Sequence, residues 1–147
     1  RATCSRSHSG ALIVRNDEIV STGYNGAPRG RSNCIDLGYC IRERLGIPAG
    51  ERYELCRSVH AEMNAIISAA RSECIGGTIY LAGRDVATGE LIPDLLPCPM
   101  CRRMIINAGL SKIVIRRTPS TYDILNVQDW VFHDDSVIDP SESGEQA

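Results

Sequence analysis

The first part of the chain alternates apolar and polar positions in short runs that are typical of strands. Leu12-Ile13-Val14 is apolar, Asn16-Asp17 supplies a turn, and residues 18–24 continue with a second β-prone run. This order predicts a β-hairpin. Residues 25–30 contain two glycines and a proline and are expected to form a loop.

The later part changes to longer apolar stretches that alternate with short ones. Residues 60–71 are rich in Ala, Ile and Met, which predicts a buried helix, and residues 97–108 predict a second helix that Gly109 ends. The short apolar runs 78–81 and 112–116 predict buried strands. Alternating strands and helices indicate an α/β domain with a parallel or mixed sheet.

Three segments do not fit this alternation. Residues 31–57 hold glycines, charges and three cysteines, so we expect an ordered insertion with a short helix near 41–45. Residues 83–96 read as a polar loop. A polar C-terminal extension covers about 118–147, and its last residues, 140–147, are expected to be mobile. We expect one domain over residues 1–147.

Composition narrows the class of protein. Of the 147 residues, 43% are hydrophobic and 23% charged, with a formal net charge of -2, which suits a globular protein without general attraction for nucleic acid. No apolar run is long enough to cross a membrane. The start of the chain lacks an apolar signal region and looks like an entry partway through a helix. We therefore expect a short upstream piece and a cytoplasmic location.

Two short motifs carry candidate metal chemistry. His60-Ala61-Glu62 opens the first predicted helix, and Pro97-Cys98-Pro99-Met100-Cys101 opens the second. Imidazole and thiolate are preferred zinc ligands, and three protein ligands leave a fourth position open for water. A helix N-terminus favours the anionic form of both thiols. The spacing predicts a catalytic zinc site at His60, Cys98 and Cys101.

Glu62 distinguishes this site from a structural one. The residue lies two positions after His60, where both side chains can enter one cavity at the first turn of a helix. Zinc lowers the pKa of a water molecule to about 7, and a nearby carboxylate can carry the proton. The pattern H-x-E with P-C-x-x-C is the signature of zinc deaminases of nucleobases. A closed structural zinc site or a pair of core cysteines is the competing interpretation.

Three stretches carry a family resemblance. They are residues 23–30 (Gly-Tyr-Asn-Gly-Ala-Pro-Arg-Gly), residues 60–66 (His-Ala-Glu-Met-Asn-Ala-Ile), and Pro97 to Cys101 running into Met104–Gly109. Together they resemble the deoxycytidylate (dCMP) deaminase family within the cytidine deaminase-like superfamily, over roughly residues 1–117.

The resemblance implies a three-layer α/β/α sandwich around a five-stranded mixed sheet. It implies hydrolytic deamination of dCMP to dUMP and ammonia, with Asn25 binding the sugar and the Ala61 backbone N–H contacting the pyrimidine carbonyl. It also implies a homo-oligomer, a hexamer in many relatives. By the same resemblance, dCTP activates and dTTP inhibits, with Mg²⁺ accompanying such a triphosphate.

The resemblance places an effector site in the loop that contains Gly23, Tyr24, Gly26 and Arg29. Its two glycines allow close approach of the backbone, and Arg29 could meet a phosphate. An ordinary turn with a solvated arginine explains the same residues equally well.

The seven cysteines indicate a reducing compartment, because an odd number cannot pair within the chain. Some relatives carry a second, structural zinc in the region of Cys34, Cys40 and Cys56, with Cys4 or His8 as a fourth ligand. Free cysteines or one disulfide are the alternatives. Cys74, at the end of a helix, is expected to be buried packing.

Two other functions remain open at this point. The first is a zinc deaminase with another substrate, such as dCTP, guanine or a tRNA adenosine. The second is a non-catalytic zinc fold that binds a nucleotide. Glu62 argues against the second, because a structural zinc has no use for a carboxylate at that place.

Overall fold

The predicted hairpin forms one edge of a five-stranded sheet. In the computed structural model, which describes residues 1–133, the strand order is β2-β1-β3-β4-β5. The strands are β1 (Ser7–Arg15), β2 (Glu18–Tyr24), β3 (Thr78–Asp85), β4 (Lys112–Arg116) and β5 (Tyr122–Asn126). Only the β3–β4 pair is parallel among these neighbours. The α/β class and the five-stranded mixed sheet are therefore confirmed.

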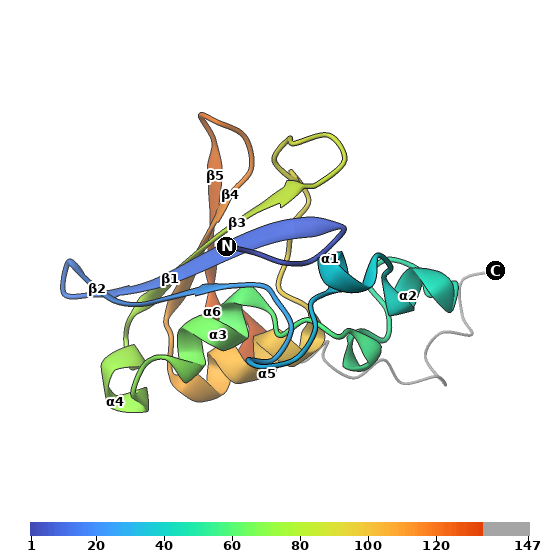
Figure 1. Ribbon diagram of the computed structural model, residues 1–147. Helices are drawn as coiled ribbons and strands as arrows, with labels where there is room; N and C mark the ends of the chain where they lie inside the picture. The colour runs from blue at the N-terminus through green and yellow to red at the C-terminus, as the bar shows by residue number, and fades with distance from the viewer. Residues whose placement is uncertain (134–147) are drawn as a thin grey trace.

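The helices lie on one side of the sheet or, within residues 31–57, beyond one end of it (Figure 1). They are α1 (Cys34–Leu37), α2 (Ile41–Arg44), α3 (Ala61–Ile67), α4 (Arg71–Cys74), α5 (Pro99–Ala108) and α6 (Val127–Phe132), with a 3₁₀ turn η1 (Tyr53–Leu55). The single helix expected over residues 60–71 is wrong in length. Ala70 is extended, and its N–H donates to the Glu73 carboxylate at 3.0 Å, so a new helix begins there.

Alternation along the strands builds the core. Ile13, Ile79 and Ile113 are aligned across β1, β3 and β4, and each is fully buried. They pack under α3 and α5, which present Ala65 and Ile105 to the same cluster. Each buried isoleucine contributes about 1.5–3 kcal/mol relative to an exposed one, so this layer is the main source of stability.

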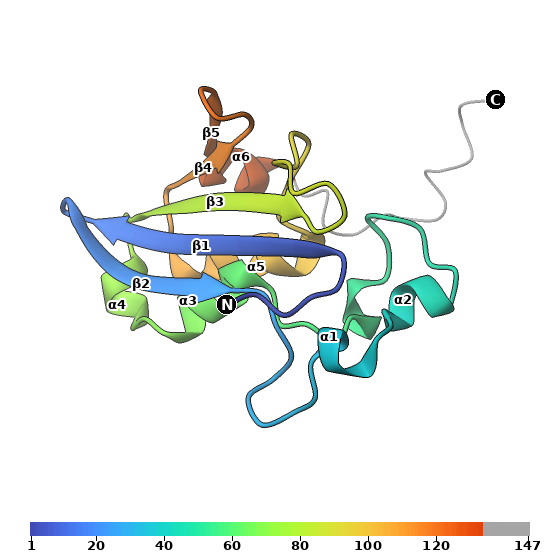
Figure 2. The same cartoon turned by 45° about the horizontal axis from the view of Figure 1, so that its top comes forward.

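The opposite face of the sheet is only partly covered. Leu12, Tyr80, Val114 and Ile124 are aligned across four strands, with Tyr80 40% and Ile124 56% exposed. Figure 2 shows these strands from above with the helices beneath them. The second helical layer of the expected sandwich is not found within residues 1–133.

The predicted insertion lies beyond one end of the sheet and contains α1, α2 and η1 (Figure 2). The short helix expected near residues 41–45 is confirmed as α2. Arg42 holds this region together. Its side chain is buried, donates to the carbonyls of Pro48 and Glu51 at 2.7 Å each, and lies over the Tyr53 ring.

The segment expected as a C-terminal extension partly belongs to the sheet. Strand β5 pairs antiparallel with β4, and α6 buries Val127 in the core. The expected mobile tail, residues 140–147, lies outside the described residues. Within residues 1–133, no helix has the length and apolarity that a membrane crossing requires.

Candidate active site

The first side of the site is the start of α3. His60 is the N-cap residue, with extended backbone angles (φ -72°, ψ 158°), and Ala61 and Glu62 form the first turn. Two hydrogen bonds between Gly26 and Val59 fix the chain just before His60 (3.1 and 2.7 Å). The first turn is thereby held against the end of β2.

The second side is the start of α5. Cys98 is the N-cap residue, Pro99 occupies the first helical position, and Cys101 follows within the first turn. Proline suits that position because its missing N–H would have no intrahelical partner there. Cys98 and Cys101 are 8% and 0% exposed. Both thiols therefore lie at the positive end of the helix dipole, away from solvent.

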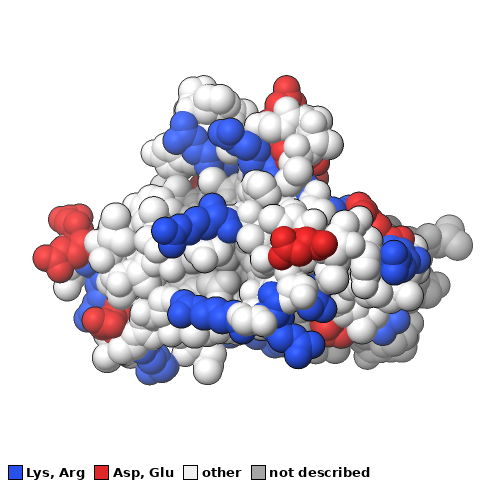
Figure 3. Space-filling model, viewed as in Figure 1, with Lys and Arg blue, Asp and Glu red and all other residues white. Residues whose placement is uncertain are grey.

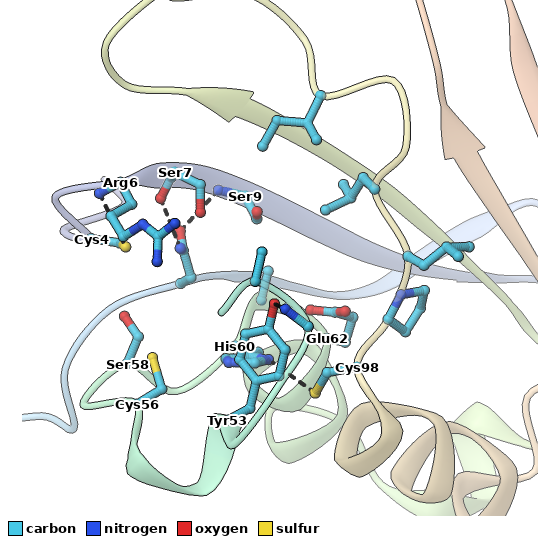
Figure 4. A pocket seen from close by; sticks show the side chains of 18 of the residues that line it. Cys4, Arg6, Ser7, Ser9, Tyr53, Cys56, Ser58, His60, Glu62 and Cys98 are labelled. Carbon is cyan, nitrogen blue, oxygen red and sulfur yellow. Dashed lines mark hydrogen bonds between the residues drawn. The ribbon is translucent and has the colours of Figure 1, made fainter. Parts of the chain in front are cut away.

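The two helix starts bring three metal-binding side chains together. His60 Nδ1 lies 3.4 Å from Cys98 Sγ, the contact dashed in Figure 4, and 3.3 Å from Cys101 Sγ. Atoms that share a tetrahedral zinc ion, with Zn–N of about 2.0 Å and Zn–S of about 2.3 Å, lie roughly 3.5 Å apart. Within residues 1–133 this is the group of His, Cys, Asp and Glu side chains close enough to share an ion. The donors fit zinc in type, number and spacing.

The three donors compete strongly for protons. The Cys101 hydrogen bond and the His60 hydrogen bond outweigh burial and lower the pKa of Cys98 to about 4. The Cys98 contact and burial raise the pKa of Cys101. Burial acts to lower the pKa of His60, but hydrogen bonds from Cys56 and Cys98 raise it to about 10. Binding of a divalent cation would displace protons from this set.

Glu62 lies beside these donors and is 6% exposed. Burial raises the pKa of its carboxyl group, while its own backbone N–H and the neighbouring His60 act in the opposite direction. A carboxyl group with a raised pKa can both accept and release a proton near neutral pH. The position suits a proton carrier.

A cavity of about 730 Å³ opens over this group, within the size range of small-molecule sites. Asn25 is buried in its wall, where its Oδ1 accepts from Ser9 N–H and its Nδ2 donates to the Ser7 carbonyl, both at 2.9 Å. One Nδ2–H remains for a ligand. Ala61 lines the same cavity and begins α3, where backbone N–H groups lack intrahelical partners.

Arginines also line the cavity. They are Arg6, Arg42 and Arg102. Arg6 forms an ion pair with Glu43 at 3.0 Å, and Arg102 lies 5.3 Å from the Trp130 ring. On the face shown in Figure 3, Lys and Arg side chains are dispersed among uncharged and acidic surface. The absence of a nucleic-acid partner stays a prediction.

The four residues expected at an effector site are not among those that line the cavity, although Asn25 of the same loop is. Gly23 packs directly on the backbone of α3, and Gly26 contacts Thr3. Tyr24 is 46% exposed, and Arg29 is exposed. Packing therefore accounts for both glycines, whereas the two side chains are open to solvent.

The cysteines of the insertion gather near one another. Burial raises the pKa of the Cys34 thiol, and negative charge on Cys4, Cys40 or Cys56 raises it further. All seven cysteines of the chain are free. Cys74 is 1% exposed and packs in the core, as expected.

Sequence reasoning missed an aromatic neighbour of His60 and the cation that packs on it. The Tyr53 ring packs edge-on against the imidazole, with centroids 5.3 Å apart, and the Arg42 guanidinium lies over the Tyr53 ring, 4.2 Å from its centroid. No motif marks either residue. Their positions in a region without periodicity gave no signal.

The fold and the site together define an α/β protein with a His-Cys-Cys metal centre beside a buried glutamate. A family model described as "Cytidine and deoxycytidylate deaminase zinc-binding region" matches residues 1–117. A deoxycytidylate deaminase of Mycobacterium phage D29 is 34% identical over 119 residues, which cover 78% of this chain and 81% of that protein. The chain therefore belongs to the cytidine and deoxycytidylate deaminase zinc-binding family.

Two further comparisons show how much of a longer relative this chain covers and which known fold it shares. The deoxycytidylate deaminase of Schizosaccharomyces pombe is 32% identical over 114 residues, covering 78% of this chain. This chain spans only 32% of that yeast protein. A crystal structure of cytidine deaminase from Burkholderia pseudomallei has the same fold, with a TM-score of 0.52 at 20% identity, covering 85% of this chain and 78% of that one.

Proposed function

We propose that this chain is a zinc-dependent deaminase that hydrolyses dCMP to dUMP and ammonia. One observation carries the proposal: His60 Nδ1 and the sulfurs of Cys98 and Cys101 converge beside buried Glu62 in the wall of the cavity. The proteins of phage D29 and fission yeast named above, both deoxycytidylate deaminases, support the choice of nucleotide.

His60, Cys98 and Cys101 would hold the zinc ion in this proposal. When bound, zinc acts as a Lewis acid that makes a nucleophile available from water near neutral pH. Glu62 accepts a proton from the attacking water and delivers it to the ring nitrogen of cytosine. It then carries a second proton to the exocyclic amine, the bond from C4 to that nitrogen breaks, and ammonia leaves as the C4 carbonyl forms.

Substrate positioning falls to groups that line the cavity. The remaining Nδ2–H of Asn25 binds the sugar, and the Ala61 N–H donates to the pyrimidine carbonyl. Two hydrogen bonds, with Ser7 and Ser9 of β1, fix the Asn25 amide group and support this role. An amide that is already fixed can orient a substrate without losing its own conformational entropy when the substrate binds. The nearby arginines suit an anionic substrate.

The test is ammonia release with dCMP, dCTP, CMP, deoxycytidine and guanine, each assayed with zinc-loaded protein. We expect turnover of dCMP above all others. Glu62→Gln should retain zinc and lose at least about 100-fold in rate, the range that general acid–base catalysis supplies. Faster turnover of another compound would show that dCMP is the wrong substrate. Zinc binding without turnover of any compound would favour a non-catalytic zinc fold that binds a nucleotide.

We further propose that deoxynucleoside triphosphates regulate the enzyme at the loop of Tyr24 and Arg29, with dCTP and Mg²⁺ activating and dTTP inhibiting. The loop contacts the site, since Gly26 pairs with Val59 directly before His60. The assay is the dCMP rate with each triphosphate, in wild type and Arg29→Ala. Equal responses of both proteins would contradict this location.

A second, structural zinc is proposed at Cys34, Cys40 and Cys56, with Cys4 as the fourth ligand. The small core of the insertion supports it, because an ion would order this region. Binding would have to draw these thiols together, since within residues 1–133 they are not a group close enough to share an ion. Elemental analysis should give two zinc ions per chain and one in Cys34→Ser. One ion in the wild type would contradict it.

We also propose a homo-oligomer, with a hexamer as the expected size, in the cytoplasm. Ile67 and Phe132 are 69% and 74% exposed on the helical side, which supports a contact between subunits. Seven free thiols favour a reducing compartment. Light scattering coupled to size-exclusion chromatography gives the subunit number, and a monomer at micromolar concentration would exclude the oligomer.

A further inference from the structure

The loop between β3 and α5 forms one wall of the cavity. It covers residues 86–97, and Ile92 and residues 94–97 line the cavity. The loop contains neither a helix nor a strand, so its path depends on bonds to other elements. Whatever fixes that path also fixes the shape of the wall that a substrate meets.

Arg117 makes such bonds from the neighbouring hairpin. It directly follows β4, and its Nη1 donates to the carbonyls of Pro93 at 3.0 Å and Leu95 at 2.6 Å. Because β3 and β4 are parallel, their carboxyl ends lie at the same edge of the sheet, where the loop after β3 comes beside the turn after β4 (Figure 1). One guanidinium therefore joins segments that are 22 and 24 residues apart in sequence.

The guanidinium is itself held in place. The Arg117 side chain is 17% exposed, and its Nε donates to Asp123 Oδ2 of β5 at 2.7 Å. The Arg117 backbone N–H donates to the Thr121 carbonyl at 2.9 Å. The planar fork of arginine can serve two loop carbonyls and one carboxylate at the same time, which the compact ammonium group of lysine cannot do in the same geometry.

The loop has a second attachment, on β3. The Ile92 N–H donates to the Gly83 carbonyl at 2.9 Å. The Leu95 side chain packs on the core and over Gly83, where a Cβ would lie 2.9 Å from Leu95 Cδ2. Without Arg117 the loop would keep this attachment, but residues 93–95 would lose their charged partner on the side of the β4–β5 hairpin.

The metal-binding end of the loop is fixed by other bonds. Arg102 of α5 donates from Nε to the Pro97 carbonyl at 3.1 Å, directly before Cys98, the N-cap of the same helix. We propose that Arg117 is a positioning residue for substrate binding, which holds residues 93–95 as a preformed wall of the cavity. This inference rests on the proposed function, because it assigns the cavity to the substrate.

The experiment compares wild type, Arg117→Leu, Arg117→Lys and Arg116→Leu as zinc-loaded full chains. Arg116→Leu is the matched control, because Arg116 is exposed and donates to the carbonyls of Thr118 and Pro119 within its own turn. The first readout is KM and kcat for dCMP. If the freed loop keeps its present position for roughly 1 to 10% of the time, apparent affinity falls by about 10- to 100-fold.

We therefore expect Arg117→Leu to raise KM by about 10- to 100-fold with kcat and zinc content close to the wild type, the pattern of lost uniform binding. Arg117→Lys should recover part of the loss, and Arg116→Leu should match the wild type. If Arg117→Leu does not fold, Arg117→Lys carries the same test with a smaller rise in KM. A fall in kcat or zinc content with KM unchanged would overturn the proposal.

The second readout is amide hydrogen exchange of peptides that cover residues 86–97, which needs no turnover. Exchange there should be faster in Arg117→Leu than in the wild type and unchanged in Arg116→Leu. Faster exchange with wild-type KM would show a merely structural role and overturn the proposal, as would unchanged exchange. A wild type that binds dCMP without deaminating it would refute the proposed function, and weaker dCMP binding by Arg117→Leu would then still support the positioning role.

Discussion

Replacing Gly23 with alanine should destabilise the protein and damage the candidate active site together. A Cβ at residue 23 would lie well under 3.0 Å from the carbonyl oxygen of Ala61 and the amide nitrogen of Ala65. Both atoms belong to the backbone of α3, so no side chain can turn aside. Strand β2 and helix α3 would have to separate by about 1 Å, the kind of backbone shift that overpacking imposes.

The magnitude follows from that separation. Overpacking of this kind costs about 1–3 kcal/mol, which corresponds to a fall in Tm of roughly 3–10 °C for a chain of this size. The moved segment starts at His60 and includes Glu62. A misplacement of about 1 Å at a reacting group can reduce the rate by roughly 100-fold, so we expect a loss of that order in kcat.

The assay is thermal unfolding together with ammonia release, with Gly10→Ala as the control. Gly10 lies on the neighbouring strand, and a Cβ there would meet nothing nearer than the Gly23 carbonyl at 3.9 Å. The control should match the wild type in both measurements. If Gly23→Ala is as stable and as active as Gly10→Ala, the packing argument is wrong.

Three further predictions concern the insertion, the loop after β3 and the metal. Arg42→Leu should destabilise the insertion by about 1.5–3 kcal/mol per charged hydrogen bond lost, seen as faster proteolysis there, whereas exposed Arg44→Leu should not. The hydrogen bond from Thr88 N–H lowers the pKa of the Asp85 carboxyl group below its ordinary value of 3.8. The stability that this carboxylate adds is therefore fully present above pH 3.8 and is lost as the pH falls through the lowered pKa. Urea unfolding should find Asp85→Asn less stable than the wild type at pH 7 and equally stable at the lowest pH. Chelation should lower Tm and added zinc restore it, because an ion that binds only the folded state stabilises it; an unchanged Tm would contradict the site.

The sequence predicted the elements whose signal is local. The hairpin, the strand at 112–116 and the helix ended by Gly109 all depend on periodicity, turn residues or caps within a few positions. The motifs at His60 and Cys98 were visible for the same reason, since each is a short pattern at the start of a helix. The break between α3 and α4 was missed because alanine and isoleucine continue through it and only Glu73 marks the restart.

Tertiary structure decided what depends on distant residues. Strand β5 has four exposed residues of five, so its sequence lacks the apolar signal, and its pairing with β4 makes it a strand. The meeting of His60 with Cys98 and Cys101 requires two helix starts almost forty residues apart in sequence to converge under one sheet. The contact of Tyr53 with His60 belongs to the same category, because η1 places the tyrosine ring against the imidazole. Local patterns fix the chemistry that each segment offers, and the packing of segments fixes which groups can act together.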